Sequence, residues 1–158
     1  MFNKRSQVKD EFESRLVDLR RVTRVTKGGK QMSFRACVVV GDKKGTIGEG
    51  TEKGPDVAIA IEKATHTAKK NLVKIAINDS TIRHQVKKKY SAAIVLLKPA
   101  SKGTGVKAGG PIRIVLELAG IENVISKMLG SNNKISNVRA TIEALQELRA
   151  TKSTKSDK

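Results

Sequence analysis

The sequence is poor in aromatic residues: its 158 residues include three Phe, one Tyr and no Trp. Proteins that bind single-stranded nucleic acids usually stack the bases on aromatic side chains, so base stacking is disfavoured here. A single cysteine, Cys37, excludes a disulfide within the chain and suits a reducing compartment. Its position in an alternating apolar run predicts a small buried side chain. His66 and His84 have no neighbouring cysteine, so neither a metal site nor a Cys–His nucleophile is predicted.

Long apolar runs and acidic residues are also scarce. No apolar run approaches the roughly 20 residues that span a bilayer, and the first residues lack a signal-peptide pattern. The chain has 32 Lys and Arg against 15 Asp and Glu, which gives a net charge of +17. Residues 1–75 hold 17 basic and 9 acidic side chains, and residues 76–158 hold 15 and 6. Because both halves are basic, we expect a polyanionic partner, with nucleic acid favoured over an anionic membrane.

The first half predicts three antiparallel strands followed by a helix. The first strand begins near Arg15 and is expected to bulge at Arg20-Arg21, where its alternation breaks. A turn at residues 27–30 leads to a second strand with Met32, Phe34, Ala36, Val38 and Val40 on one face. In a third strand, residues 46–51, Gly48 and Gly50 predict a close approach to the backbone. Pro55 opens the helix, with an apolar stripe through Leu72 and Ile75 and a cationic face of Lys63, His66, Lys70 and Lys74.

The second half predicts a ββαβα unit after a composition shift at residues 78–80. A hairpin is expected over residues 82–97 with its turn at Lys87–Lys89, then a helix from Pro111 to Gly120. A strand over residues 123–129 and a helix over residues 135–148 complete it. The fold class is therefore α+β, with an N-terminal βββα domain that resembles the double-stranded-RNA-binding domain without its leading helix. The predicted boundaries are a flexible arm (1–11), a first domain (12–76), a second domain (77–149) and a disordered tail (150–158).

A glycine-rich loop, residues 101–110, precedes Pro111 and at first suggests a phosphate cradle. It lacks the Gly-Lys-Ser/Thr ending of a P-loop. Gly103, Gly105 and Gly109 are also one residue too widely spaced for the dinucleotide fingerprint. No carboxylate pair, nucleophile or base is suitably placed. We therefore predict no enzyme activity, catalytic residue, metal, cofactor or small-molecule substrate.

The first hairpin carries the strongest functional signal, with seven basic residues and one acid, Asp18, between residues 15 and 35. Arg and Lys side chains neutralise phosphates, and glycines let a turn approach a partner closely. A solvated surface is the alternative for the cationic face of the helix, although a basic hairpin beside it favours RNA. The predicted RNA-binding residues are Arg20, Arg21, Arg24, Thr26, Lys27, Gly28, Gly29, Lys30, Arg35, Lys63 and Lys70.

Several short peptides, spread along the chain in a fixed order, indicate a family resemblance. The first half contains RVTRVTKGGK (21–30), FRA (34–36) and VVVGD (38–42). The second contains KPAS (98–101), GTGV (103–106), AGGP (108–111), LELAG (116–120) and GSNN (130–133). Together they resemble the small-subunit ribosomal protein five family, bacterial or plastid type, from about Phe12 to Leu148.

The resemblance implies a second domain with a left-handed βαβ crossover, as in some small-molecule kinases. It implies a place near the neck of the small subunit, bound to small-subunit ribosomal RNA, close to where the messenger enters and beside ribosomal proteins four and eight. In this family the first hairpin reaches RNA and is linked to spectinomycin response. The loop before the helix lies towards protein four and affects decoding fidelity, so Gly103, Thr104, Gly105 and Arg113 are predicted protein-interface residues. The localisation implied is the ribosome of a bacterial cytoplasm or a plastid stroma.

Some positions depart from the family pattern. Lys107 stands where an apolar residue is usual, Lys134 where Pro is usual, and Glu49 and Glu52 add negative charge to the third strand.

Two other functions are alternatives to the ribosomal one. The first is a double-stranded RNA-binding regulator outside the ribosome. The second is a phosphotransferase, which the lack of a serine-rich nucleotide loop disfavours.

Overall fold

The computed structural model describes residues 12–77 and 80–148. The predicted arm (1–11), part of the predicted boundary (78–79) and the predicted tail (150–158) lie outside the described residues. The elements, in chain order, are β1 (Glu13–Thr26), β2 (Gly29–Gly41), β3 (Thr46–Gly54), α1 (Val57–Lys70), β4 (Leu72–Lys74), β5 (Val86–Tyr90), β6 (Ala93–Pro99), β7 (Val106–Lys107), α2 (Gly110–Ala119), β8 (Val124–Met128) and α3 (Lys134–Glu147). They form an α+β protein of two domains, as predicted. None of its helices, over the residues described, is long and apolar enough to cross a membrane.

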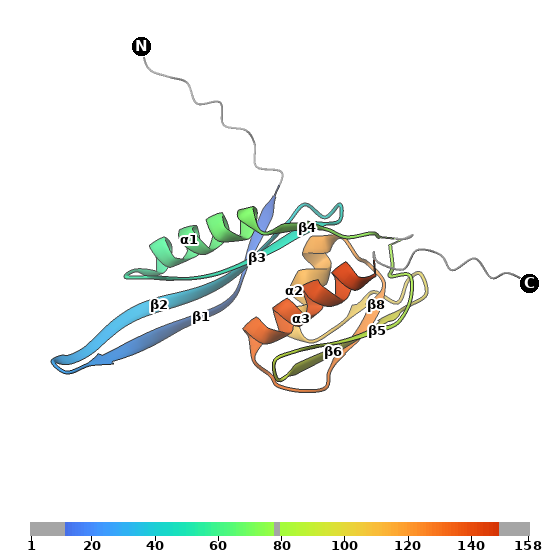
Figure 1. Ribbon diagram of the computed structural model, residues 1–158. Helices are drawn as coiled ribbons and strands as arrows, with labels where there is room; N and C mark the ends of the chain where they lie inside the picture. The colour runs from blue at the N-terminus through green and yellow to red at the C-terminus, as the bar shows by residue number, and fades with distance from the viewer. Residues whose placement is uncertain (1–11, 78–79, 149–158) are drawn as a thin grey trace, which may run out of the picture.

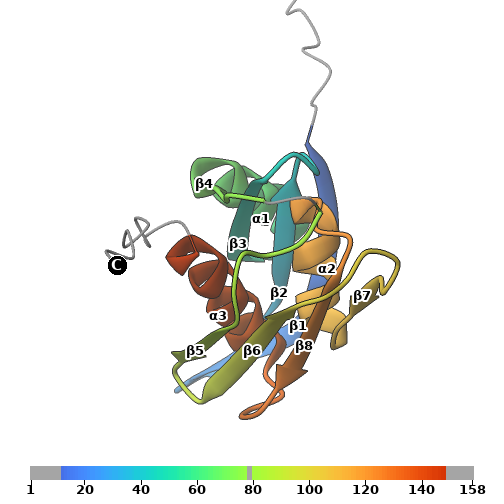
Figure 2. The same cartoon turned by 90° about the vertical axis from the view of Figure 1, so that its right-hand side faces the viewer.

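The helices and sheets stack in four layers (Figures 1 and 2). The first sheet, in the order β1-β2-β3-β4, is covered on one face by α1. Helices α2 and α3 lie against its other face and separate it from the second sheet, which has the order β5-β6-β8-β7. Strand β2 is therefore buried on both faces: Ala36, Val38 and Val40 pack against α1, while Cys37 and Val39 join the core of the second domain.

Helix α1 packs unusually close to β3. Its buried residues are all alanines: Ala60, Ala64 and Ala68. A Cβ built on Gly48 would lie 2.3 Å from the carbonyl oxygen of Ala68, and one built on Gly50 would lie 2.0 Å from that of Ala64. Both distances are far below van der Waals contact, so a side chain there would push the helix off the sheet. The close approach predicted at these glycines is thus to the backbone of α1.

Three sequence predictions about the first domain are wrong in detail. The bulge lies between Leu16 and Asp18 and not at the arginine pair, because Val17 turns into the core between the domains. Helix α1 ends at Lys70, and the apolar residues beyond it continue into the short strand β4, which pairs with β3. Pro55 precedes the N-cap residue, Asp56, and therefore lies outside the first turn.

In the second domain, β5 includes Lys87–Lys89, so the predicted turn there is wrong. The turn lies at Ser91, whose φ is +52°, and alternating side chains of β5 explain the burial of Val86 against the exposure of Lys87. The short strand β7 was not predicted. It pairs in parallel with β8, and α2 connects the two as a βαβ crossover. The predicted helix stop is confirmed, since Gly120 caps α2 with a φ of +86°.

The two domains share one hydrophobic core. Val17, Val39 and Ile47 of the first domain join the cluster that contains Leu118 and Leu145 of the second. The β2–β3 turn is also bonded to the end of α2: the Lys43 N–H donates to the Leu118 carbonyl (2.9 Å), and the Gly45 N–H to that of Ala119 (3.0 Å). We therefore expect the domains to keep a fixed orientation.

Candidate RNA-binding surface

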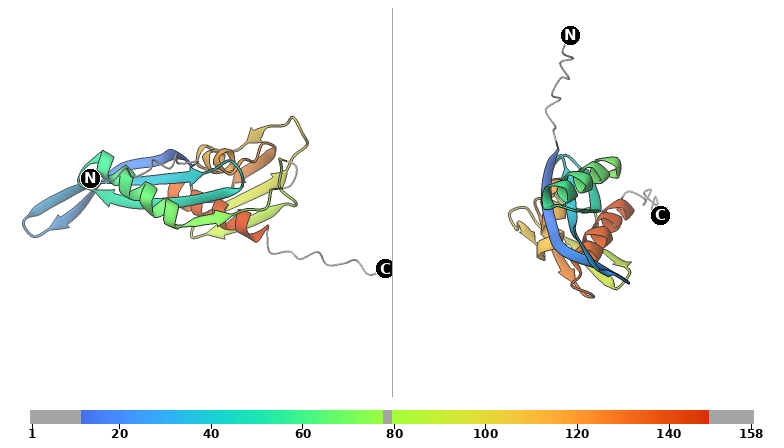
Figure 3. Two further views of the ribbon diagram at one scale, coloured as in Figure 1. Left: turned by 90° about the horizontal axis from the view of Figure 1, so that it is seen from above. Right: turned by 90° about the vertical axis from the view of Figure 1, so that its left-hand side faces the viewer.

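The β1–β2 hairpin extends well beyond the rest of the first sheet. Strand β3 pairs with β2 only as far as Phe34, opposite Gly54. From Val22 and Ser33 outward the hairpin has two strands only, and it projects past the end of α1 and away from the second domain (Figure 3, left). At about 3.3 Å per residue, the projecting part from Val22 to Thr26 is roughly 13 Å long. We call residues 19–35 the basic ribbon.

The strand register divides the side chains of the basic ribbon between two faces. Residues directly opposite each other in an antiparallel pair share a face, and successive residues alternate. Because Ala36 and Val38 face α1, the same face carries Leu19, Arg21, Thr23, Val25, Lys30, Met32 and Phe34. The opposite face, on the side of the second domain, carries Arg20, Val22, Arg24, Thr26, Gln31, Ser33 and Arg35. The predicted cations therefore lie on both faces.

The basic ribbon has six cations and no acid. The nearest carboxylate, Asp18, lies at its root and is 8% exposed. It accepts ionic contacts from Arg20 (Nε–Oδ2 3.0 Å) and from Lys134 of α3 (Nζ–Oδ1 3.1 Å). Among the described residues, no other carboxylate forms an ion pair with a cation of the ribbon, so its positive charge is uncompensated outward of Arg20.

Two glycines, Gly28 and Gly29, lie at the tip of the ribbon. Lys27 and Gly28 form the turn, which the Thr26 hydroxyl stabilises by donating to the carbonyl of Gly29 (3.1 Å). Gly29 has a φ of +141°, a conformation that other residues rarely adopt. Gly28 does not need a positive φ, and a Cβ built on it meets no atom within 4 Å. The fold therefore does not require glycine at position 28.

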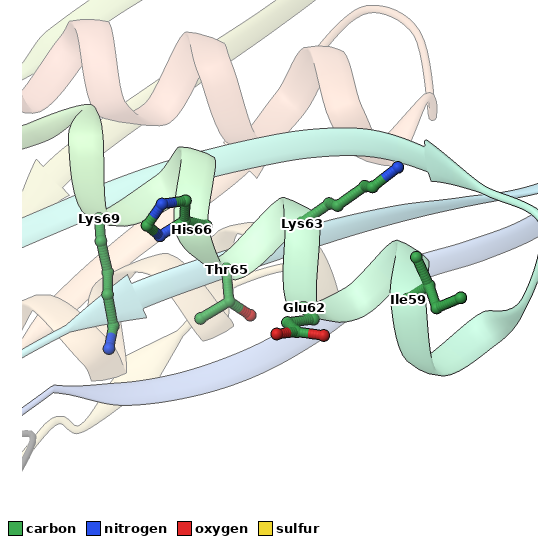
Figure 4. Close-up of a pocket in the computed structure, with 6 residues that line it drawn as sticks. All are labelled: Ile59, Glu62, Lys63, Thr65, His66 and Lys69. Carbon is green, nitrogen blue, oxygen red and sulfur yellow. The ribbon is translucent and has the colours of Figure 1, made fainter.

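The two predicted helix residues lie apart from the ribbon. Lys63 and Lys70 are exposed and, at a spacing of seven, share one face of α1 with His66. Lys63 and His66, together with Lys69, line a shallow depression of about 530 Å³ (Figure 4). Lys63 and Lys69 point away from each other, so they do not form one cation cluster (Figure 4). Lys74, predicted on this face, lies in β4 instead.

The glycine-rich loop is held by a residue that sequence analysis did not single out. The backbone N–H groups of Gly103 and Gly105 both donate to Oδ1 of Asn123 (3.0 and 3.2 Å). Because these N–H groups are occupied, they do not form a cradle for a phosphate. Asn123 is 5% exposed, and a buried amide is the kind of residue that such a loop requires. No spacing rule in the sequence marks it.

The predicted protein-interface residues lie together at one end of α2. Arg113 donates from Nη2 to the Val106 carbonyl (3.0 Å), which braces the loop that contains Gly103, Thr104 and Gly105. Its side chain is 54% exposed. An open depression of about 560 Å³ beside it includes Lys107 and Lys127. This end of the domain therefore presents a rigid, cationic corner to solvent.

No group of three or more His, Cys, Asp or Glu residues able to hold a metal occurs among residues 12–77 and 80–148. Cys37 is buried, and burial raises the pKa of its thiol. A buried thiol of raised pKa is a poor nucleophile.

Comparison with known proteins agrees with this architecture. The family model described as ribosomal protein S5, N-terminal domain, matches residues 12–76, and that described as ribosomal protein S5, C-terminal domain, matches residues 88–157. The chain belongs to the ribosomal protein S5 family. Among curated relatives in this family, the small ribosomal subunit protein uS5c of Spinacia oleracea is 49% identical over 148 residues. The aligned region covers 93% of this chain and 48% of the relative, so the chain spans about half the length of that S5 protein.

Proposed function

We propose that this S5 family member is a structural, RNA-binding protein of the small ribosomal subunit, in a bacterial cytoplasm or a plastid stroma. It binds small-subunit ribosomal RNA, supports assembly of the subunit and contributes to translational accuracy near the neck and the site where the messenger enters. Membership of a structural, non-enzymatic family supports this function. The observation that carries it is the acid-free basic ribbon, which projects from the fold with six cations.

The proposed binding residues act mainly on the RNA backbone. Arg24, Lys27 and Lys30 lie at the outer end of the ribbon, where no carboxylate of the described chain pairs with them. Each phosphate that such a side chain neutralises adds about 0.7 to 0.9 to the slope of log affinity against log salt concentration. The lysine face of α1, Lys63 and Lys70, adds weaker contacts because it lies apart from the ribbon. Gly28 and Gly29 bring the backbone of the tip against the RNA.

Charge reversal at the outer ribbon tests this function. We expect Arg24→Glu, Lys27→Glu and Lys30→Glu together to weaken binding to small-subunit ribosomal RNA and to lower the salt slope by about two to three. The measurement is filter binding of the purified full chain over a salt titration. Unchanged affinity and slope would refute the proposed role of the ribbon.

The matched control reverses three exposed lysines of the second sheet, Lys87, Lys89 and Lys127. This variant has the same net charge as the ribbon variant, so it reports the effect of total charge alone. We expect it to retain most of the affinity. An equal loss in the two variants would show that net charge, and not the ribbon, determines binding.

We further propose that the corner formed by Gly103, Thr104, Gly105 and Arg113 contacts ribosomal protein four, and that protein eight is a second neighbour. The exposure of Arg113 and its bracing of the loop support this contact. In cells whose small subunits contain this chain, we expect Arg113→Leu to raise miscoding in a reporter assay. Normal error rates with the variant incorporated would contradict the interface.

Sedimentation distinguishes the ribosomal function from that of a free double-stranded RNA-binding regulator. A ribosomal protein should migrate with small subunits in a high-salt gradient, because many contacts hold it in place. A regulator would remain at the top of the gradient.

A further inference from the structure

We propose that the basic ribbon is inserted between two separate segments of RNA, one against each of its faces. This inference rests on the proposed function and specifies how the same surface binds. The face on the side of the second domain would contact one RNA backbone through Arg20, Arg24 and Arg35. The face on the side of α1 would contact another through Arg21 and Lys30.

The distribution of charge favours a partner on each side. A protein that lies flat on one RNA segment needs cations on one face only, with neutral or acidic residues facing solvent. Here both faces are cationic, and neither has a carboxylate between residues 19 and 35. Arg20 is partly neutralised by Asp18, so the two faces present similar positive charge outward of the root.

The exposed apolar residues of the ribbon support contact on the α1 side. Val25 is 73% exposed and Met32 is 52% exposed, and both lie on this face with Arg21 and Lys30. Two-stranded hairpins are at best marginally stable in water, so a long ribbon with uncovered apolar residues is expected to gain a partner. The adjacent cations, Arg21 and Lys30, favour RNA as that partner over a basic protein, because they complement phosphates.

The shape of RNA argues against a single duplex that touches both faces. The major groove of an A-form helix is deep but too narrow to admit a ribbon with its side chains. The minor groove is wide and shallow, so a ribbon that lies on it offers only one face. Contact with both faces therefore needs two RNA segments, such as two helices that meet at a junction.

Directed cleavage tests the arrangement. Cys37 is first replaced by Ala, and a single cysteine is then introduced as Gln31→Cys on one face or Thr23→Cys on the other. Both positions are exposed, and neither belongs to the proposed binding residues. Each cysteine carries a tethered iron chelate that generates hydroxyl radicals. The full chain is bound to small-subunit ribosomal RNA, and the cleaved nucleotides are mapped by primer extension.

We expect the two probes to cleave two sets of nucleotides that belong to different helices. Lys30→Glu should reduce only cleavage from Thr23→Cys, and Arg24→Glu only cleavage from Gln31→Cys, with a loss of about one unit of salt slope in each case. The Cys37→Ala parent without a probe should give no cleavage.

Two results would overturn the inference. Cleavage of one shared set from both positions would mean a single RNA segment, and cleavage from one position alone would mean that the other face is bare or covered by protein. Absence of RNA binding by the unmodified chain would instead refute the proposed function itself. The binding and salt titration of the unmodified chain, measured first, separate these cases.

Discussion

The ion pair between Glu49 and Arg139 should stabilise the contact between the two domains. Arg139 Nε lies 2.8 Å from Glu49 Oε1, and Arg139 Nη1 donates to the hydroxyl of Tyr90 at 3.0 Å. The hydrogen bond to Tyr90 and the charge of Glu49 raise the pKa of Arg139. Glu49 is 16% exposed, and its second oxygen, Oε2, is buried without a hydrogen-bond partner. Arg139→Met would leave this carboxylate unpaired at the interface.

The cost of that substitution lies between two limits. Removing one partner of a fully buried pair costs about 3 to 5 kcal/mol, and exposed pairs contribute about 0 to 1 kcal/mol. Because Arg139 is 38% exposed and solvent screens the pair, we expect a loss of about 2 kcal/mol. For a chain of this length that loss corresponds to roughly 4 to 8 °C in Tm.

Urea unfolding of four proteins measures the coupling: the wild type, Arg139→Met, Glu49→Gln and the double variant. We expect the double variant to recover about 1 kcal/mol relative to Arg139→Met, because the uncompensated charge is gone. Lys88→Met is the matched control, since it removes the more exposed pair with Glu147 (3.3 Å) and should cost under about 0.5 kcal/mol. An Arg139→Met variant as stable as the wild type, or a coupling near zero, would refute the reasoning.

Three further outcomes are expected. Although partial burial raises the pKa of Asp42, the N–H groups of Thr46 and Lys44 lower it below its usual value overall. The contribution of Asp42 to the free energy of unfolding is therefore present above its pKa in the unfolded chain and is lost as the pH falls through its pKa in the folded protein. We expect Asp42→Ala to lower the free energy of unfolding by about 1 kcal/mol at pH 7 and to flatten this acid dependence, measured by urea unfolding. The Cys37 thiol should react with a disulfide reagent only as fast as the protein unfolds, and rapid labelling of the native chain would contradict its burial. Gly28→Ala should leave the Tm unchanged but weaken binding to ribosomal RNA, whereas Gly29→Ala should also lower the Tm because of its φ of +141°.

The sequence predicted the elements whose pattern is local. Alternation in β2 and the glycines around α2 have direct physical causes, namely side-chain period and backbone conformation, and both predictions are confirmed. The predicted position of the bulge is wrong because Val17 packs into a core that includes residues of the second domain. No local sequence pattern contains that information. Polarity alone predicts a turn at Lys87–Lys89, but a strand with one solvent-facing side accommodates lysines well.

The candidate site divides in the same way. A run of cations around Gly28-Gly29 is visible in the sequence, and so is the absence of acids that makes it an uncompensated surface. The division of those cations between two faces depends on the strand register, which pairs Arg20 with Arg35 and which no local sequence pattern specifies. Asn123, which occupies the N–H groups of the glycine loop, is 18 and 20 residues away from its partners and could not be found from spacing.

Two of the positions expected to depart from the family pattern, Glu49 and Lys134, form ion pairs across the domain interface. Glu49 pairs with Arg139, and Lys134, at the first position of α3, pairs with Asp18. Asp18 in turn contacts Arg20, so a single buried carboxylate connects the second domain to the root of the basic ribbon. A projecting two-stranded ribbon can hold a defined angle only if its root is fixed, because its outer part has no third strand. Under the proposed function, the second domain would therefore serve RNA binding indirectly, because it anchors the root of the ribbon. Among the described residues, no carboxylate forms an ion pair with the cations beyond Arg20, which leaves them available to phosphates.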